Sequence, residues 1–348
     1  MRRDQDHFRG CLLAGAVGDA LGAPVEFLRY HHIIQEYGPG GIRDLQPGAN
    51  GLALITDDTQ MTLFTAEGIL RAITRWSHKG ICHPPTVVFH AYQRWLLTQG
   101  YPEDPEFGWV YDGWLLEVKD LYDRRGPGTT CLSALLSRKP GLIEAPLNNS
   151  KGCGGVMRMA PAGLALSRDR VFLMAAEFAA LTHGHPSGYL SAGTLAMIVF
   201  NLVEGYELSA AIEDAMQELA MHKDHEECTA VLEKALSLLE SDLPDQRAIQ
   251  QIGEGWVGEE ALAIAVYCAM KYPHDLSKAL IAAVNHDGDS DSTGAITGNI
   301  LGAYLGVGAI PGDWLAKLEL REVITELADD LLVNYREGHD WWQRYPGY

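Results

Sequence analysis

The 348-residue sequence is poor in basic residues. Lys and Arg number 27 against 46 Asp and Glu, which gives a formal net charge of −19. A nucleic-acid-binding surface needs clustered positive charge, so we expect none in this protein. A pocket for a small nucleotide-like ligand is still compatible with this balance, because a local field can oppose the net charge. We interpret most of the acidity as serving solubility.

The sequence also lacks paired cysteines and a leader-like N-terminus. Its six cysteines are scattered without a C-x-x-C pair, so neither a zinc knuckle nor a disulfide framework is predicted. The apolar part of the N-terminal stretch is interrupted by Asp19 and followed by Pro24, which argues against a signal peptide. No apolar run is as long as a membrane span. We therefore expect a cytoplasmic protein in a reducing compartment, with no membrane partner.

Strand-like alternation, fixed-period repeats and linkers are scarce or absent. Apolar residues recur at helical spacing along most of the chain, and the glycine- and proline-rich breaks are short and dispersed. Only residues 41–56 suggest a short strand or hairpin. The sequence predicts an all-α fold with a single domain over residues 1–348.

Two acidic runs each precede a predicted helix. "ITDDT" contains Thr56, Asp57 and Asp58, and "DGDSDS" contains Asp289, Asp291 and Ser292. One Thr or Asp suffices to cap a helix, and either run taken alone is also explained by capping. Two runs of the same composition and context favour oxygen ligands for hard cations such as Mg²⁺ or Mn²⁺, with two ions ~3.5–4 Å apart. An EF-hand is excluded, because no Glu follows at its twelfth position.

Three further motifs are less specific. "SKGCGGVMRMAP" predicts a helix that contains Met157 and Arg158 and is opened by glycines suited to approach a phosphate, although a tight packing turn explains it equally well. "LTHGHP" places His183 and His185 after a helix, where a helix C-cap is the usual role. Glu26 follows a proline break and is explained by default as a surface residue.

The order of these motifs resembles the ADP-ribosylglycohydrolase family, which includes the dinitrogenase reductase-activating glycohydrolases. The matching stretches lie between about Phe8 and Leu332 and are "GDALGAPVEF", "ITDDTQMT", "RGPGTT", "SKGCGGVMRMAP", "THGHPSGY", "EGWVGEEALAIAVYCAM" and "NHDGDSDSTGAITGNILGA". The resemblance implies an orthogonal all-α bundle with a dinuclear Mg²⁺ or Mn²⁺ centre in a cleft. It also implies enzymes that remove ADP-ribose from modified side chains, often arginine.

The resemblance carries over to individual residues. Ser292 stands where Thr is common in relatives, which keeps the hydroxyl, and Asp287 replaces a Gly of some relatives without a clear role. Glu26 matches a glutamate that some members use near the metals. The implied metal ligands are Thr56, Asp57, Asp58, Asp289, Asp291 and Ser292. The implied ligand-binding residues are Gly152, Gly154, Gly155, Val156, Met157 and His183.

Cleavage of a glycosidic bond at ribose builds positive charge on the anomeric carbon, and a carboxylate must accept the proton of the attacking water. Asp57 or Glu26 is the expected base. Trp109, Tyr111 and Tyr189 are candidates for stacking on adenine. The expected partners are ADP-ribosylated proteins and ADP-ribose. Two alternatives stay open: hydrolysis of another linkage (serine, O-acetyl-ADP-ribose or nucleobase), and direct neutralisation of an ADP-ribosyltransferase toxin, for which we see no N-terminal arm.

Overall fold

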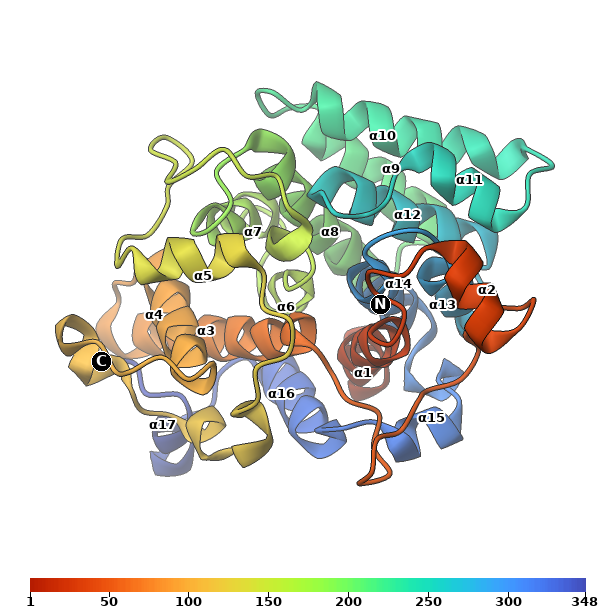
Figure 1. The fold of residues 1–348 in the computed structure, drawn as a ribbon. Helices are drawn as coiled ribbons and strands as arrows, with labels where there is room; N and C mark the ends of the chain where they lie inside the picture. Colours follow the sequence, from red (N-terminus) through yellow and green to blue (C-terminus); the bar gives the residue numbers. More distant parts are fainter.

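The computed structural model describes residues 1–348 and confirms the all-α prediction (Figure 1). The α-helices are α1 (Gln5–Gly22), α2 (Tyr30–Tyr37), α3 (Asp57–Lys79), α4 (Pro84–Thr98), α5 (Thr129–Leu136), α6 (Ala160–Ala165), α7 (Val171–Ala180), α8 (Pro186–Val203), α9 (Leu208–Leu219), α10 (Glu226–Ser237), α11 (Asp245–Ile252), α12 (Gly258–Lys271), α13 (Leu276–Val284), α14 (Ser290–Leu305), α15 (Gly312–Lys317), α16 (Arg321–Val333) and α17 (His339–Arg344). Short 3-10 helices are η1 (Pro105–Val110), η2 (Trp114–Glu117), η3 (Lys119–Leu121), η4 (Cys153–Gly155), η5 (Leu238–Glu240) and η6 (Val307–Ala309). In Figure 1, α3 and α5 lie across the view while α1 is seen nearly end-on, so the helices run in crossing directions.

The predicted hairpin within residues 41–56 is wrong. The segment forms a loop in which the Gly48 N–H donates to the Leu52 carbonyl at 2.8 Å and closes a turn. Ala53 then makes one isolated parallel bridge with Leu318, near the other end of the chain. This segment is thus a loop that is attached to the C-terminal part of the chain through Ala53. Its alternating apolar residues resemble those of a strand, and local periodicity alone does not distinguish the two.

Helices α1 and α14 form a closely packed antiparallel pair at the centre of the molecule. Glycines recur every fourth residue along α14 and face small residues of α1, so that Gly302 faces Gly10 and Gly294 faces Gly18. A methyl group at Gly10 would lie 2.5 Å from the Gly302 carbonyl oxygen, and one at Gly18 would overlap the Gly294 carbonyl. Only glycine allows the two backbones this approach. As a result, the start of α14 lies against the end of α1.

The hydrophobic core is one connected cluster to which α1, α3, α8, α12 and α14 all contribute. Helix α8 has the length and apolar composition of a membrane-spanning helix, contrary to the expectation that no such run exists, but 94% of it is buried inside the protein. It therefore serves as a central core helix of this fold. The assignment of one domain to residues 1–348 stays a prediction.

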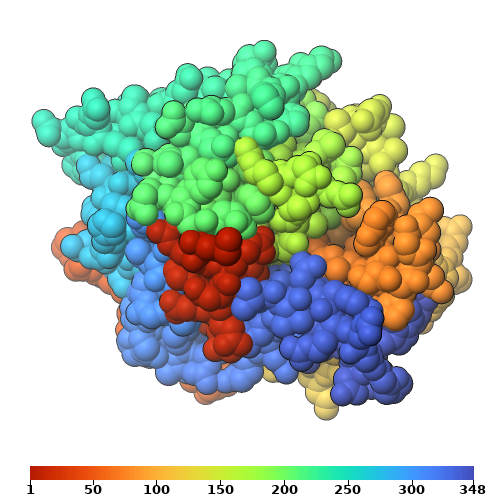
Figure 2. All heavy atoms as spheres, turned by 180° about the vertical axis from the view of Figure 1, so that it is seen from behind, coloured from red at the N-terminus to blue at the C-terminus, as the bar shows by residue number.

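The N-terminal residues close the back of the molecule. Arg2 donates from Nη1 to the Tyr206 carbonyl at 2.6 Å, and its guanidinium lies 4.7 Å from the centre of the Tyr304 ring. Figure 2 shows this segment, in red, between the green region near residue 200 and the blue C-terminal region. The start of the chain thus joins α8 and α14 on the face seen from behind in Figure 2.

Candidate metal centre and ligand cleft

The two acidic runs meet in one cleft. Asp57 and Asp58 form the first turn of α3, and Asp289 caps α14 by accepting the Ser292 N–H at 3.2 Å. The cleft has a volume of about 390 Å³ and lies between the start of α3, the start of α14 and the loop that follows α1. Its lining includes Glu26, Asp57, Asp58, Gly152, Gly154, Met157, His183, Asp289, Asp291 and Ser292. Thr56, Gly155 and Val156 are buried outside this lining.

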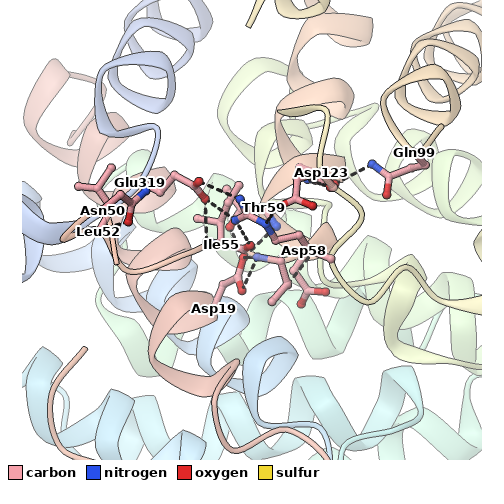
Figure 3. Close-up of polar contacts among 12 residues, drawn as sticks. Asp19, Asn50, Leu52, Ile55, Asp58, Thr59, Gln99, Asp123 and Glu319 are labelled. Carbon is pink, nitrogen blue, oxygen red and sulfur yellow. Dashed lines mark hydrogen bonds and ion pairs between the residues drawn. The ribbon is translucent and has the colours of Figure 1, made fainter. Parts of the chain in front are cut away.

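Asp19 positions the start of α3, and sequence reasoning missed it. From inside α1 its carboxylate accepts the Thr56 N–H at 3.0 Å, the Thr59 N–H at 3.1 Å and the Thr59 hydroxyl at 2.5 Å (Figure 3). Thr56 in turn caps α3 by accepting the Asp58 N–H at 3.2 Å. Asp19 therefore fixes both the capping residue and the first turn of α3. The signal in the sequence was a lone Asp within an otherwise apolar, small-residue helix.

Three carboxylates of the cleft converge on one point. Ligand atoms of Glu26, Asp289 and Asp291 all lie within 4.8 Å of one another. Both aspartates are 3% exposed, whereas Glu26 is half-buried. Asp58 Oδ2 is buried without a hydrogen-bond partner. A buried anionic oxygen with no donor is costly, which indicates that this atom faces a ligand.

Burial and mutual repulsion raise the pKa values of these carboxyl groups. Burial, followed by the charge of Asp291, raises the pKa of Glu26 to about 10, that of Asp57 to about 8 and that of Asp19 to about 7. The pKa values of Asp58 and Asp289 are also raised, first by burial and then by Asp291. A bound divalent cation offsets both causes. Carboxylates and hydroxyls are the oxygen ligands of hard cations, so the residues present fit such an ion.

The glycine run forms one wall of the cleft, but not as predicted. It opens the 3-10 helix η4, and α6 begins only at Ala160, so Met157 and Arg158 lie in a turn rather than in a helix. The Cys153 N–H donates to the Trp256 carbonyl at 3.1 Å, which ties the wall to the segment before α12. The Cys153 thiol lies 2.7 Å from Asp289 Oδ2, a contact that sequence reasoning did not foresee.

The two histidines have different roles. His183 is 2% exposed and lines the cleft beside the glycine wall. Its pKa is lowered to about 3 by burial and by the charge of Arg158, so the ring is neutral. His185 accepts the Ser187 N–H at 3.1 Å and thereby caps the start of α8. The predicted C-terminal cap is therefore wrong, because His185 caps the following helix rather than the preceding one.

The aromatic residues at the cleft are not those predicted. Phe27 and Trp256 line the cleft and stack with ring centroids 5.3 Å apart and an interplanar angle of 22°. Trp109 and Tyr111 line two other cavities, while Tyr189 is 8% exposed and absent from the cleft lining. The pair joins two segments far apart in the sequence, and neither segment carries a local signal for it.

Two further residues have structural positions that the motifs did not reveal. Asp287 accepts the Tyr30 N–H at 2.6 Å and thus holds the start of α2. The backbone N–H of Gly128 points to Asp57 Oδ2 at 3.4 Å, so the loop before α5 closes over the start of α3.

Comparisons with known proteins identify a family over nearly the whole chain. A family model described as ADP-ribosylglycohydrolase matches residues 1–340. The ADP-ribosyl-[dinitrogen reductase] glycohydrolase of Rhodospirillum rubrum is 28% identical over 91% of each chain. ADP-ribosylarginine hydrolase Tri1 of Serratia proteamaculans is 27% identical, over 94% of this chain and 79% of that protein. A solved structure described as an ADP-ribosylglycohydrolase-related protein complex superposes with a TM-score of 0.64 at 27% identity, covering 96% and 99% of the two chains.

Proposed function

The chain belongs to the ADP-ribosylglycohydrolase family, and from this premise we propose that it removes ADP-ribose from modified arginine side chains of proteins. The observation that carries the proposal is the convergence in one cleft of two acidic helix starts, a glycine wall and a neutral histidine. The acidic helix starts suit the ribose of an ADP-ribosylated side chain, and the glycine wall together with the histidine suits its diphosphate.

In this proposal the acidic end of the cleft holds two Mg²⁺ or Mn²⁺ ions. The proposed ligands are Thr56, Asp57, Asp58, Asp289, Asp291 and Ser292. Bound divalent ions would orient hydroxyl groups of the ribose and lower the pKa of a water molecule. Two features support such ions. A cation would give the buried Asp58 Oδ2 a partner, and it would stabilise the ionised form of Asp57, whose pKa is raised in its absence.

The glycine wall binds the phosphate-bearing part of the substrate. Gly152 and Gly154 expose backbone to the cleft, and a methyl group at Gly154 would already lie 3.0 Å from Cys131 Sγ and 3.1 Å from His183 Cε1. The missing side chains let phosphate oxygens approach the backbone N–H groups closely. His183 adds a polar side chain beside the same wall.

Glu26 is the proposed base. It is the least buried carboxylate of the cluster and lies at the mouth of the cleft, next to Phe27. Water attacks the anomeric carbon while the bond from that carbon to the guanidine nitrogen breaks. Glu26 takes the proton from the water and passes it to the departing nitrogen, so that the arginine side chain leaves with its ordinary guanidinium group. Asp57, the alternative base, is assigned to metal binding because it is 6% exposed and accepts from the Gly128 N–H.

The surroundings of the mouth favour arginine over a neutral linkage. A guanidinium group is a cation, and Glu26 stands there together with the stacked faces of Phe27 and Trp256. Carboxylates and aromatic faces both stabilise a guanidinium. The name of the Serratia relative, an ADP-ribosylarginine hydrolase, points to the same linkage.

A substrate panel tests the proposal. Purified protein is incubated with arginine-, serine- and nucleobase-linked ADP-ribose and with O-acetyl-ADP-ribose, and released ADP-ribose is quantified with Mg²⁺, with Mn²⁺ and with chelator. We expect release from the arginine linkage that chelator and Asp58→Asn abolish. Asp120→Asn, at an exposed residue outside the cleft, is the matched control and should keep full activity. Preferred release from another linkage would replace arginine, and no release from any substrate would refute hydrolysis.

A further inference from the structure

Arg158 is a buried cation without an acidic partner. Its side chain is 0% exposed, and no carboxylate lies within ion-pair distance of it. Nη2 donates to Thr182 Oγ1 at 2.7 Å, and Nη1 meets only the sulfur atoms of Met61 at 3.2 Å and Cys131 at 3.5 Å. The guanidinium lies 4.3 Å from the centre of the Tyr92 ring, and Nε has no partner. Burying an unpaired charge is costly, so a role beyond packing is indicated.

The hydroxyl group of Thr182 connects this cation to His183. Thr182 Oγ1 lies 2.8 Å from His183 Nδ1 and 3.4 Å from the Ala179 carbonyl oxygen. Arg158 already donates to this oxygen, and the single hydroxyl hydrogen has two possible acceptors. The shorter contact, to Nδ1, is the stronger one. If the hydroxyl donates to Nδ1, the neutral ring carries its own hydrogen on Nε2.

The Nε2 atom of His183 faces the glycine wall. A methyl group at Gly152 would lie 3.4 Å from Nε2, and one at Gly154 would lie 3.3 Å from it. The ring therefore presents Nε2 to the side of the cleft at which the wall is open to a ligand. Because Arg158 lies behind Thr182, its positive charge opposes a second proton on the ring and keeps the ring neutral.

We propose that Arg158 is a positioning residue which, through Thr182, holds His183 in its Nε2–H form so that the ring donates a hydrogen bond to a phosphate oxygen of the ligand. The identity of that ligand rests on the proposed function, whereas the tautomer does not. The opposite tautomer would require Thr182 to accept from both Arg158 and Nδ1–H and to donate only over 3.4 Å. The neutral His183 ring can thus donate a hydrogen bond to a phosphate oxygen without carrying a charge of its own.

Nitrogen NMR of the imidazole ring tests the tautomer directly. Metal-free, ¹⁵N-labelled protein is measured near neutral pH, and the His183 signals are identified by their loss in His183→Gln. We expect a protonated Nε2 and an unprotonated Nδ1 in the wild type and in Thr182→Ser. Thr182→Val should lose this preference, because it keeps the shape of the residue and removes the hydroxyl. A protonated Nδ1 in the wild type, or an unchanged ring in Thr182→Val, would overturn the proposal.

Binding of ADP-ribose, measured by calorimetry, adds a second readout. One lost hydrogen bond predicts about tenfold weaker binding for Thr182→Val and for Arg158→Gln, with Thr182→Ser within about twofold of the wild type. Should Arg158→Gln fail to fold, the comparison of Thr182→Val with Thr182→Ser still tests the proposal. Equal affinity of Thr182→Val and wild type would count against the proposal. A wild-type protein that binds no ADP-ribose would refute the proposed function. The NMR measurement of the His183 tautomer would still test the role of Arg158 and Thr182.

Discussion

At the scale of the residue, Glu26 differs from the other carboxylates of the cluster. It lies in the loop after α1 rather than in a helix start, and it is the only one that is half-buried. We expect Glu26→Gln to lower kcat by about 10²- to 10³-fold, as loss of a general base does, while metal binding is kept. Steady-state kinetics together with the melting temperature at increasing Mg²⁺ would check both parts.

Asp58→Asn is the comparison for Glu26→Gln. Because Asp58 Oδ2 is buried and unpartnered, this substitution should weaken metal binding and reduce activity together. If Glu26→Gln instead lost its metal-dependent rise in melting temperature, Glu26 would be assigned to metal binding and the base would have to be sought at Asp57.

The pKa of Asp57 predicts a pH dependence of stability in the metal-free protein. Burial raises this pKa from 3.8 to about 8. A carboxyl group with a raised native pKa contributes stability that is present below its unfolded pKa and is lost as the pH rises through the native value. In chelator, Asp57→Asn should therefore gain melting temperature relative to wild type as the pH is raised from 4 to 8.

Differential scanning fluorimetry of the two proteins side by side measures this gap. Excess Mg²⁺ is the control, because positive charge in the cleft stabilises the ionised Asp57 and should close or reverse the gap at pH 8. A gap that does not change with pH would show that Asp57 titrates normally in the folded protein.

Consecutive oxygen-bearing residues before apolar helices made the acidic side of the cleft predictable. Asp57, Asp58, Asp289 and Asp291 lie where local sequence places them, at helix starts. Asp19 and Trp256 were not predictable, because each acquires its role from a segment distant in the chain. Local patterns identify which side chains leave a helix start, whereas tertiary packing decides which other side chains they meet.

At the scale of the element, the close packing of α1 on α14 through glycines brings the end of α1 next to the acidic start of α14. Gly18→Ala would insert a methyl group into the Gly294 carbonyl and push the helices apart. We expect a loss of about 1–3 kcal/mol in the free energy of unfolding from overpacking, reduced by the ~1 kcal/mol that Ala gains over Gly in a helix. Metal affinity should fall as well, because α14 carries Asp289 and Asp291.

The matched control is Gly312→Ala in α15, where a methyl group would have nothing within 4 Å. Chemical denaturation of both variants gives the free energy of unfolding, and isothermal titration with Mn²⁺ gives the affinity. Equal stability of the two variants would show that α1 and α14 can separate without cost.

The same glycines explain part of what the sequence could not predict. The glycines of α14 are spaced by four, but nothing local in the sequence says that the partner of this helix is α1, almost three hundred residues earlier. The run after Ser150 likewise predicts a helix start, whereas the backbone there pairs with the segment before α12 through Gly152 and Val257. Glycine permits both conformations, so only the tertiary partner distinguishes them.

At the scale of the whole molecule, the acidic end of the cleft is assembled from the first and last fifths of the chain around a single core. The start of α3 is held by Asp19 of α1, and the start of α14 is held by the packing of α14 on α1. Carboxylate repulsion acts against this assembly in the absence of cations. Ions that bind both acidic runs would therefore stabilise the fold as a whole rather than one loop.

Calorimetric unfolding at increasing metal concentration tests this coupling. At a free concentration of Mg²⁺ or Mn²⁺ about 100 times the dissociation constant, binding to the native state alone adds ~2.7 kcal/mol, or about 4 °C in melting temperature. Because one core includes both helices that carry the acidic runs, the entire transition should shift as a single peak. Asp58→Asn should show little shift at the same concentration, and Asp120→Asn should follow the wild type. A shift confined to one of two peaks would mean that the ions stabilise only part of the molecule, and that the two acidic runs are not joined through them.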